Sequence, residues 1–191
     1  MDILIEIDHK IFHFINDTIA NPFLDWIMPI ITNENNLAIP LTLLWLWLLL
    51  FNGKRGKIAA VLLLLTVAIT DIVAAQIIKP YFERLRPSRA MIDNINLLVS
   101  RGGKYGFVSN HAANTMAAAT IILYFFKKWG YLAIAISIIV GFSRIYVGVH
   151  YPYDVIGGWL FGFTTAWIMI STWVFIKIRE MKRGKSWIKY S

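Results

Sequence analysis

Long apolar runs are the feature of this chain that most limits what it can fold into. Four runs approach the roughly 20 helical residues that cross the hydrocarbon core of a membrane; they cover residues 58–78, 112–126, 131–149 and 155–178. A fifth run, residues 37–51, is short, but a bilayer can thin to meet it. The sequence therefore predicts an all-α fold, a polytopic membrane helical bundle with five transmembrane helices.

Composition and charge agree with a membrane protein and argue against other classes. Hydrophobic residues make up 58% of the 191 residues and the mean hydropathy is +0.59, which is more apolar surface than a soluble domain of this size can bury. The chain has no cysteine, so disulfides, thiolate zinc sites and cysteine nucleophiles are excluded. A net charge of +8 could indicate nucleic-acid binding, but the basic residues are distributed as in a membrane protein, and no nucleic-acid partner is expected.

The N-terminal segment, residues 1–36, is predicted to lie along the membrane surface. Its apolar residues recur in helical spacing at Leu4, Ile7, Ile11, Phe14, Ile15 and Ile19. Charged and amide residues interrupt this pattern at Glu6, Asp8, Lys10, His13, Asn16 and Asp17, which is typical of an interfacial amphipathic helix. A second short helix is expected from Pro22, with Asn21 as its N-cap. If part of residues 11–31 crosses the membrane instead, the bundle has six spans.

Lysine and arginine cluster in three places that five spans put on one side of the membrane. The clusters lie between spans one and two, between spans three and four, and after span five: Lys54, Arg55 and Lys57; Lys127 and Lys128; Lys177, Arg179, Lys182, Arg183, Lys185 and Lys189. Short cytoplasmic loops collect such residues. We therefore expect these clusters, including a basic tail over residues 179–191, to be cytoplasmic and the N-terminal segment to be external.

Other basic residues fall on the opposite side, against this trend, at Lys79, Arg84, Arg86, Arg89, Arg101, Lys104 and Arg144. Lys79 and Arg86 are seven residues apart, nearly two helical turns, so both are expected to project from one side, with Pro80 ending span two and starting a short helix. Two converging cations suit a phosphate, since arginine grips two oxygens and lysine adds a point charge. For this pair alone, snorkelling at a membrane boundary is an equally good interpretation.

The start of the third span holds Ser109, Asn110 and His111. A helix N-terminus presents unpaired N–H groups and the positive end of the helix dipole, which together bind anions. His111 would then lie beside the anion. A lone histidine at a helix start is more often a surface or capping residue, so this segment alone is a weak indication.

The connection between the last two spans carries a third group of polar residues. Ser143 and Arg144 end the fourth span, and His150 and Asp154 lead into the fifth, whose first turn suits Pro152. One helical turn separates His150 from Asp154, so the carboxylate can accept a hydrogen bond from one ring nitrogen and leave the other as a nucleophile. Viewed alone, the two residues could equally be a structural pair.

Together the three segments supply two histidines, an orienting carboxylate, three cations and a helix N-terminus on one membrane face. That set is complete for in-line phosphoryl transfer through a phosphohistidine. Carboxylates and histidines nowhere have the spacing of a dinuclear metal site. Positive side chains are therefore expected to neutralise the charge that metals carry elsewhere, and neither a metal nor a cofactor is expected.

The same residues resemble the signature of the type 2 phosphatidic acid phosphatase family, which includes the vanadium haloperoxidases. The signature reads K-x6-R-P, P-S-G-H and S-R-x5-H-x3-D, and nine of its positions recur in order at Lys79, Arg86, Pro87, Ser109, His111, Ser143, Arg144, His150 and Asp154. The resemblance runs from about residue 37 to the end of the last span. It implies a membrane phosphatase domain over residues 37–178.

The resemblance also implies a role for each residue. His150 attacks phosphorus, Asp154 orients it, and His111 protonates the leaving oxygen. The phosphate is held by Lys79, Arg86, Arg144, Ser109 and the amide of Asn110. The second motif departs from the family at Val108, where proline is usual, and at Asn110, where glycine is usual. Glycine permits positive φ there and asparagine tolerates the same conformation best, so the chemistry is expected to persist.

Resemblance and topology together predict a lipid phosphatase of a bacterial-type plasma (inner) membrane with its active site on the outer face. Undecaprenyl diphosphate is the leading substrate, and phosphatidylglycerol phosphate, phosphatidic acid and the 1-phosphate of lipid A are alternatives. Arg101 and Lys104 could meet a second phosphate or simply be solvated. A lipid-binding or transport protein without turnover is the alternative of another class, and a haloperoxidase is disfavoured because those relatives are soluble. His111, His150 and Asp154 argue against mere binding, which needs no acid, base or nucleophile.

Two further features are interpreted as structural. Asp71 lies inside span two, eight residues before Lys79, and an intramembrane carboxylate is a functional hypothesis by default. Two helical turns put it about 12 Å from Lys79 along the helix, so an internal hydrogen-bond role is favoured. Gly158 and Gly162 form a small-residue face that is typical of close helix packing.

Overall fold

The computed structural model describes residues 2–90 and 95–185. Its elements follow in the order α1 (Asp2–His13), a π-helical turn (Phe14–Thr18), α2 (Pro22–Thr32), α3 (Glu34–Phe51), α4 (Gly53–Val73), a second π-helical turn (Ala74–Ile78), α5 (Lys79–Phe82), a 3-10 turn (Pro87–Arg89), α6 (Asn110–Phe125), α7 (Lys127–Tyr146) and α8 (Pro152–Lys182). Within the described ranges an isolated β-bridge joins Leu85 to Tyr105. The predicted all-α class is confirmed.

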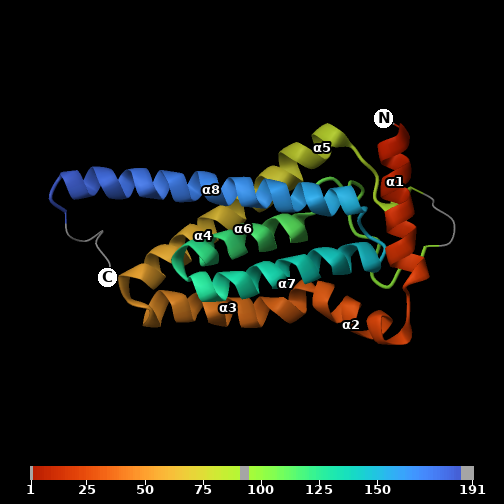
Figure 1. Ribbon diagram of the computed structural model, residues 1–191, viewed down its shortest axis with the longest axis horizontal. Helices are drawn as coiled ribbons and strands as arrows, with labels where there is room; N and C mark the ends of the chain where they lie inside the picture. Colours follow the sequence, from red (N-terminus) through yellow and green to blue (C-terminus); the bar gives the residue numbers. More distant parts are fainter. Residues whose placement is uncertain (1, 91–94, 186–191) are drawn as a thin grey trace.

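The bundle is formed by α3, α4, α6, α7 and α8, which lie along its long axis (Figure 1). Helix α6 is central and packs against α4, α7 and α8, while α3 packs against α4 at one edge. A core cluster from α4, α6 and α8 contains Ala59, Ile121, Phe125, Ala166 and Ile170. The arrangement brings the start of α6, the end of α7 and the start of α8 to one end of the bundle.

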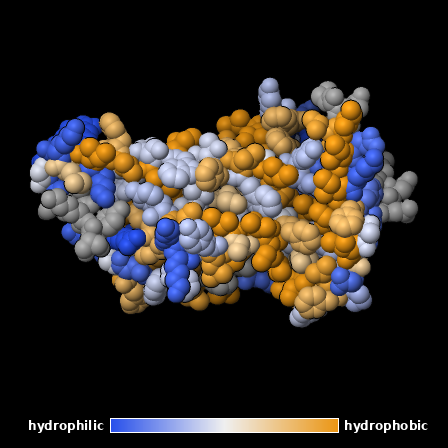
Figure 2. Space-filling view, in the orientation of Figure 1, coloured by the Kyte–Doolittle hydropathy of each residue, from blue (hydrophilic) through white to orange (hydrophobic). Residues whose placement is uncertain are grey.

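Four stretches in the described part of the chain are long and apolar enough to cross a membrane: residues 34–51, 53–82, 127–146 and 152–182. Helix α6, predicted as the third span, has 16 residues and falls short of the roughly 20 that a full crossing takes. Hydrophobic side chains cover much of the length between the two more hydrophilic ends (Figure 2). The chain is therefore a multi-span membrane protein, and the crossing of α6 stays a prediction.

The N-terminal segment folds into two short helices, as predicted. The Asn21 side chain caps α2 by accepting a hydrogen bond from the Leu24 N–H at 3.1 Å, and Pro22 opens the helix. Helix α1 runs crosswise over the end of the bundle (Figure 1). That direction is the one an interfacial helix would take, although its place in the interface remains a prediction.

Helices α6 and α8 approach each other backbone to backbone at the predicted glycines. A Cβ on Gly162 would lie 2.0 Å from the Ala113 carbonyl oxygen, and one on Gly158 would lie 2.7 Å from that of Ser109. Any larger side chain would push the two helices apart. The glycines therefore set the distance between the first turn of α6 and the first turns of α8, which both carry predicted site residues.

The predicted helical relation between Lys79 and Arg86 is wrong. The helix through α4 and α5 ends at Phe82, where Glu83 takes a left-handed conformation with φ 48°. Arg86 lies beyond it in extended backbone, held by the bridge between Leu85 and Tyr105. The Arg86 N–H donates to the Lys104 carbonyl oxygen at 3.3 Å. The two cations approach each other through this reversal of the chain.

Candidate active site

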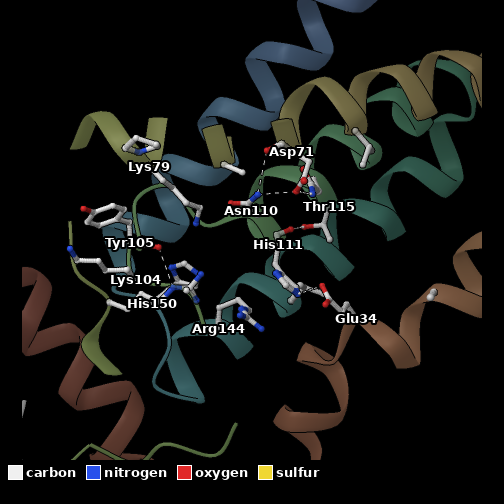
Figure 3. Close-up of a pocket in the computed structure, with 18 of the residues that line it drawn as sticks. Glu34, Asp71, Lys79, Lys104, Tyr105, Asn110, His111, Thr115, Arg144 and His150 are labelled. Atoms are coloured by element: carbon white, nitrogen blue, oxygen red, sulfur yellow. Dashed lines mark hydrogen bonds and ion pairs between the residues drawn. The ribbon is translucent and has the colours of Figure 1, made fainter. Parts of the chain in front are cut away.

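The three predicted segments meet at one end of the bundle. Six of the eight predicted site residues line one cavity of about 600 Å³ (Figure 3): Lys79, Arg86, Asn110, His111, Arg144 and His150. A second cavity of about 610 Å³ shares Arg86, His111 and Arg144 with the first, and its other lining residues include Thr32, Asn33 and Ser100. The other two predicted residues, Ser109 and Asp154, are fully buried beside this site.

His150 and Asp154 form the contact that their spacing predicts. Their side chains are 1% and 0% exposed, and His150 Nδ1 lies 3.4 Å from Asp154 Oδ2. Such contacts are often long before substrate binds. The same carboxylate oxygen accepts the Tyr151 N–H at 3.0 Å, which fixes Asp154 in the first turn of α8. Because Nδ1 faces the carboxylate, Nε2 is the nitrogen left for chemistry.

The electrostatic surroundings of His150 favour its neutral form. Burial, followed by the charges of Arg86, Arg144 and Lys79, holds the pKa of His150 well below its ordinary value. A neutral imidazole has a free lone pair, which a nucleophile requires. These surroundings therefore keep a nitrogen lone pair of His150 free.

The cations of the site keep polar atoms unpaired. Lys79 Nζ, Arg86 Nη1, Arg144 Nε and Ser109 Oγ are buried and have no hydrogen-bond partner among the described residues. Each arginine is nevertheless held in place: Arg86 Nε donates to the Tyr105 carbonyl oxygen at 3.2 Å, and Arg144 Nη1 donates to Thr32 Oγ1 at 2.6 Å. Buried donors without an acceptor are costly, so this group suits a ligand rich in negatively charged oxygens.

His111 is the second residue of α6 and lies more loosely than His150. Its side chain is 24% exposed, and its Nε2 is 4.0 Å from Glu34 Oε2. Burial, followed by the charges of Arg144, Arg86 and Lys79, lowers the pKa of His111 to about 3. A negatively charged ligand in the cavity would raise the pKa of His111, because it would offset the charge of the same cations.

Asn110 differs from the expectation for a glycine replacement. It is the first residue of α6, and among the described non-glycine residues positive φ occurs at Glu83. Its side chain instead donates to Asp71 Oδ1 at 2.8 Å, as does that of Asn114. The predicted internal hydrogen-bond role of Asp71 is thus confirmed, and the asparagine ties the start of α6 to α4.

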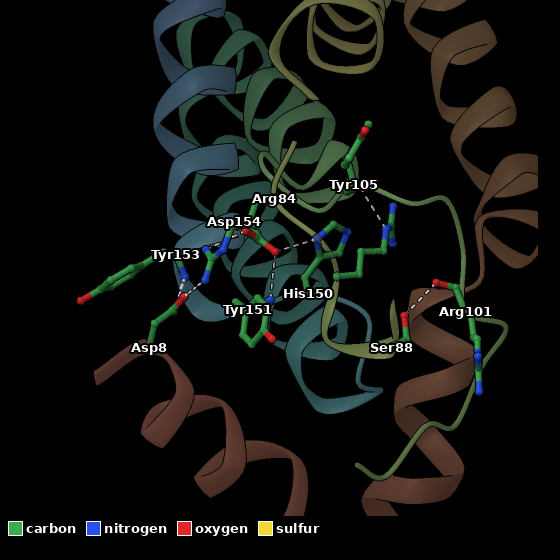
Figure 4. A network of polar contacts seen from close by, with 10 residues as sticks. Asp8, Arg84, Ser88, Arg101, Tyr105, His150, Tyr151, Tyr153 and Asp154 are labelled. Carbon is green, nitrogen blue, oxygen red and sulfur yellow. Dashed lines mark hydrogen bonds and ion pairs between the residues drawn. The ribbon is translucent and has the colours of Figure 1, made fainter. Parts of the chain in front are cut away.

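Three site features escaped the sequence analysis. Arg84 donates from Nη1 to Asp154 Oδ1 at 2.9 Å (Figure 4). Glu34 at the start of α3 lines both cavities. Gly106 passes so close to the site that a Cβ there would lie 2.7 Å from Asp154 Oδ2. Only Arg84 had a sequence signal, because it is one of the basic residues that fall on the side opposite the three basic clusters.

Of the two cations proposed for a second phosphate, Lys104 lines the first cavity, whereas Arg101 lines neither cavity. Figure 3 shows the Lys104 side chain turned away from Lys79 and His150, and its Nζ lies 5.1 Å from the centre of the Tyr105 ring. Arg101 is exposed, and its carbonyl oxygen accepts the Ser88 hydroxyl at 3.0 Å.

Known proteins resemble this chain in sequence and in fold. The chain is 32% identical over 179 residues to a lipid A 4'-phosphatase of Bacteroides thetaiotaomicron, covering 85% of this chain and 79% of the relative. It is 34% identical over 150 residues to an undecaprenyl-diphosphatase of Sulfolobus acidocaldarius, covering 76% and 69%.

A solved structure, the transmembrane PAP2 type phosphatidylglycerolphosphate phosphatase of Bacillus subtilis, superposes with a TM-score of 0.72 over 90% of this chain and 87% of that one, at 24% identity. At that identity the likeness supports the fold alone. Residues 59–178 match the PAP2 superfamily. The chain therefore belongs to the PAP2 superfamily and is a membrane lipid phosphatase.

Proposed function

We propose that the protein hydrolyses a lipid phosphate or diphosphate through a phosphohistidine on His150, without a metal. The observation that carries the proposal is the setting of His150. One ring nitrogen is held by Asp154, burial and nearby cations keep the ring neutral, and Lys79, Arg86 and Arg144 carry unpaired donors beside it.

In the first step, His150 Nε2 attacks the terminal phosphorus in line with its bond to the leaving oxygen, which is the lipid oxygen of a monophosphate or the bridging oxygen of a diphosphate. A bond forms from nitrogen to phosphorus, the bond from phosphorus to the leaving oxygen breaks, and that oxygen takes a proton from His111. The imidazole becomes positively charged, and Asp154 stabilises it. Lys79, Arg86, Arg144 and the free N–H groups at the start of α6 take up the charge on the phosphoryl oxygens.

In the second step, water attacks the phosphohistidine. His111 accepts a proton from the water as the new bond to phosphorus forms, and the bond to His150 Nε2 breaks. Inorganic phosphate leaves and His150 returns to its neutral form. The same groups serve both steps, since the acid of one direction is the base of the other.

His111 can act as an acid only if the substrate raises its proton affinity. Burial, and after it the charges of Arg144, Arg86 and Lys79, lowers its pKa to about 3. A phosphate dianion among Lys79, Arg86 and Arg144 would offset their charge, so we infer that substrate arrival protonates His111. The acid is then active only in the loaded site.

The leading substrate is undecaprenyl diphosphate. Ala38, Leu41, Val67, Ala75 and Val140 give the first cavity an apolar wall beside His111, which suits a prenyl chain on the leaving side. Relatives named undecaprenyl-diphosphatase come from Sulfolobus acidocaldarius and Bacillus subtilis. Phosphatidylglycerol phosphate and phosphatidic acid remain alternatives with the same chemistry.

A lipid A phosphate is the second candidate. The second cavity, which adjoins the site, is lined by polar side chains including Asn33, Asn35 and Ser100, so it offers hydrogen bonds that a prenyl chain cannot use but a sugar can. Lipid A 4'-phosphatases of two bacteria match over 85% and 94% of this chain.

We further propose that the site opens on the outer face of a bacterial inner membrane. The turn between α3 and α4, the turn between α6 and α7 and the end of α8 lie at the end of the bundle away from the site (Figure 1). Those places carry the basic clusters that favour the cytoplasm. Cysteine labelling at residue 127 tests this orientation. A cysteine at this position that reacts only from outside the cell would refute it.

The proposal is tested by phosphate release from purified protein in detergent with excess chelator. Undecaprenyl diphosphate, lipid A, phosphatidylglycerol phosphate and phosphatidic acid are compared at equal concentration, and orthovanadate is added as an imitation of the transition state. We expect chelator-resistant release from at least one lipid and its inhibition by vanadate. Loss of activity that magnesium or zinc restores would refute the metal-free mechanism, and no release from any lipid would refute the function.

A further inference from the structure

We propose that helix α1 supplies a positioning residue for catalysis: Asp8 holds Arg84, and Arg84 holds Asp154 in the orientation that His150 needs. The inference rests on the proposed function, because Asp154 matters here as the partner of the nucleophile. It extends the active site to a helix that lies before the matched residues 59–178.

One guanidinium joins two buried carboxylates (Figure 4). Arg84 Nη1 donates to Asp154 Oδ1 at 2.9 Å, and Arg84 Nη2 donates to Asp8 Oδ2. Both carboxylates are 0% exposed, while the Arg84 side chain is 26% exposed. Arginine suits this bridge because its planar fork can serve two acceptors at fixed angles.

Both carboxylate oxygens of Asp8 accept hydrogen bonds from groups outside α1. Its other oxygen, Oδ1, accepts the Tyr153 N–H at 2.9 Å, so both oxygens point away from α1 toward the start of α8. A carboxylate buried completely is stable only when it is paired or hydrogen-bonded. The two contacts therefore lock α1, the segment before Arg86 and the first turn of α8 to each other.

Ring contacts hold α1 in the same place. His9 stacks on Tyr151 with ring centres 4.9 Å apart, and Phe12 meets the same ring edge to face at 5.4 Å. The Arg84 guanidinium also lies over the Tyr151 ring, with its central carbon 4.5 Å from the ring centre. Tyr151 adjoins His150 in the chain, so α1, Arg84 and the nucleophile share one packed layer.

The order of contacts gives Arg84 a function beyond packing. Asp154 has two oxygens: Oδ2 faces His150 and the Tyr151 N–H, and Oδ1 faces Arg84. Without Arg84, Asp154 could turn about its χ angles and withdraw Oδ2 from His150. Partners of this kind typically change rates by about 10- to 100-fold when removed.

The test compares Asp8→Asn with Glu6→Gln in the full-length protein. Asparagine keeps the size of Asp8 and the acceptor for Tyr153 but loses the charged acceptor for Arg84. Glu6 is the matched control, because it is on the same helix and its ion pair with Lys10 is exposed, at 63% and 74%. Release of phosphate from dioleoyl phosphatidic acid and from undecaprenyl diphosphate is measured, together with thermal unfolding.

For Asp8→Asn we expect kcat to fall about 10- to 100-fold on each lipid the wild type accepts, with KM within about twofold. A KM that stays level shows that the phosphate site is intact, which a loosened fold would not preserve. Glu6→Gln is expected to match the wild type. An unchanged kcat for Asp8→Asn, or a fall explained by the folded fraction, overturns the proposal.

A double-mutant cycle covers the case in which Asp8→Asn folds poorly. Arg84→Gln is expected to lower kcat as much as or more than Asp8→Asn, and Asp8→Asn should then add less than about threefold in the Arg84→Gln background, because the two residues act in series. Fully multiplicative losses would show that they act independently and refute the relay. If the wild type releases no phosphate from any lipid, the proposed function fails and this inference falls with it.

Discussion

The two histidines of the site have opposite surroundings, although three cations act on both. The His150 side chain is 1% exposed and is bound through Asp154 to residues from α1 and from the segment before Arg86. The His111 side chain is 24% exposed, lines both cavities, and has the exposed Glu34 as its nearest carboxylate at 4.0 Å. One histidine is fixed by the protein, and the other is open to the ligand.

This difference indicates how the two proposed roles are divided. A nucleophile gains from a fixed tautomer and orientation before substrate arrives. An acid that faces a lipid leaving group needs space for that group. It also needs to gain its proton when the negatively charged phosphate binds. Replacing each histidine, or a residue that acts on it, therefore tests whether the two histidines have different roles.

The largest effect is expected for His150→Ala. No other side chain in the site is placed to form the covalent intermediate, so turnover should fall to the background on lipids and on p-nitrophenyl phosphate alike. Phosphate release by the purified variant, with unfolding measured in parallel, checks this. Wild-type rates in a folded His150→Ala protein would refute the phosphohistidine mechanism.

Asp154→Asn should lower kcat by roughly 10²- to 10⁴-fold. Asparagine keeps a hydrogen-bonding group beside His150 Nδ1 but cannot stabilise the charged imidazole or enforce its tautomer. Steady-state kinetics on the preferred lipid give the value. A loss below about tenfold would mean that His150 does not depend on the carboxylate.

His111→Ala should separate substrates by their leaving groups. The alkoxide released from a lipid monophosphate such as phosphatidic acid needs a proton, so its release should slow by roughly 10²- to 10⁴-fold, whereas p-nitrophenolate leaves without one. If the protein accepts p-nitrophenyl phosphate, the variant should keep most of its activity on it. Equal losses on the two substrates would reassign His111 to binding phosphate.

The pH dependence is the smallest expected effect. Because burial and the cations hold the pKa of His150 well below its ordinary value, the nucleophile stays neutral, and kcat/KM corrected for substrate ionisation should not fall as the pH drops through about 6.5. Removing one cation in Arg144→Gln raises that pKa and should move the acidic limb to higher pH. An acidic limb near 6.5 in the wild type, or one that Arg144→Gln leaves in place, would contradict this account.

The parts of the site that local spacing determines could be predicted from the sequence. His150 and Asp154 are one helical turn apart, and Ser109 precedes a helix, so their placement follows from the helix period. The pairing of Arg84 with Asp8 could not be predicted, because the two are 76 residues apart and meet only where α1 crosses the bundle. The helical relation expected between Lys79 and Arg86 is not found, because the helix ends at Phe82 and the chain reverses there.

The central claim is the covalent intermediate on His150, and rapid alkaline quenching of turnover with a ³²P-labelled lipid phosphate tests it most directly. Phosphohistidine survives base and is lost in acid, so the label can be followed to a peptide. The account predicts base-stable label on the peptide that contains His150, formed at least as fast as phosphate is released and missing from His150→Ala. Phosphate release that outruns the appearance of label, or label on any other residue, would contradict it.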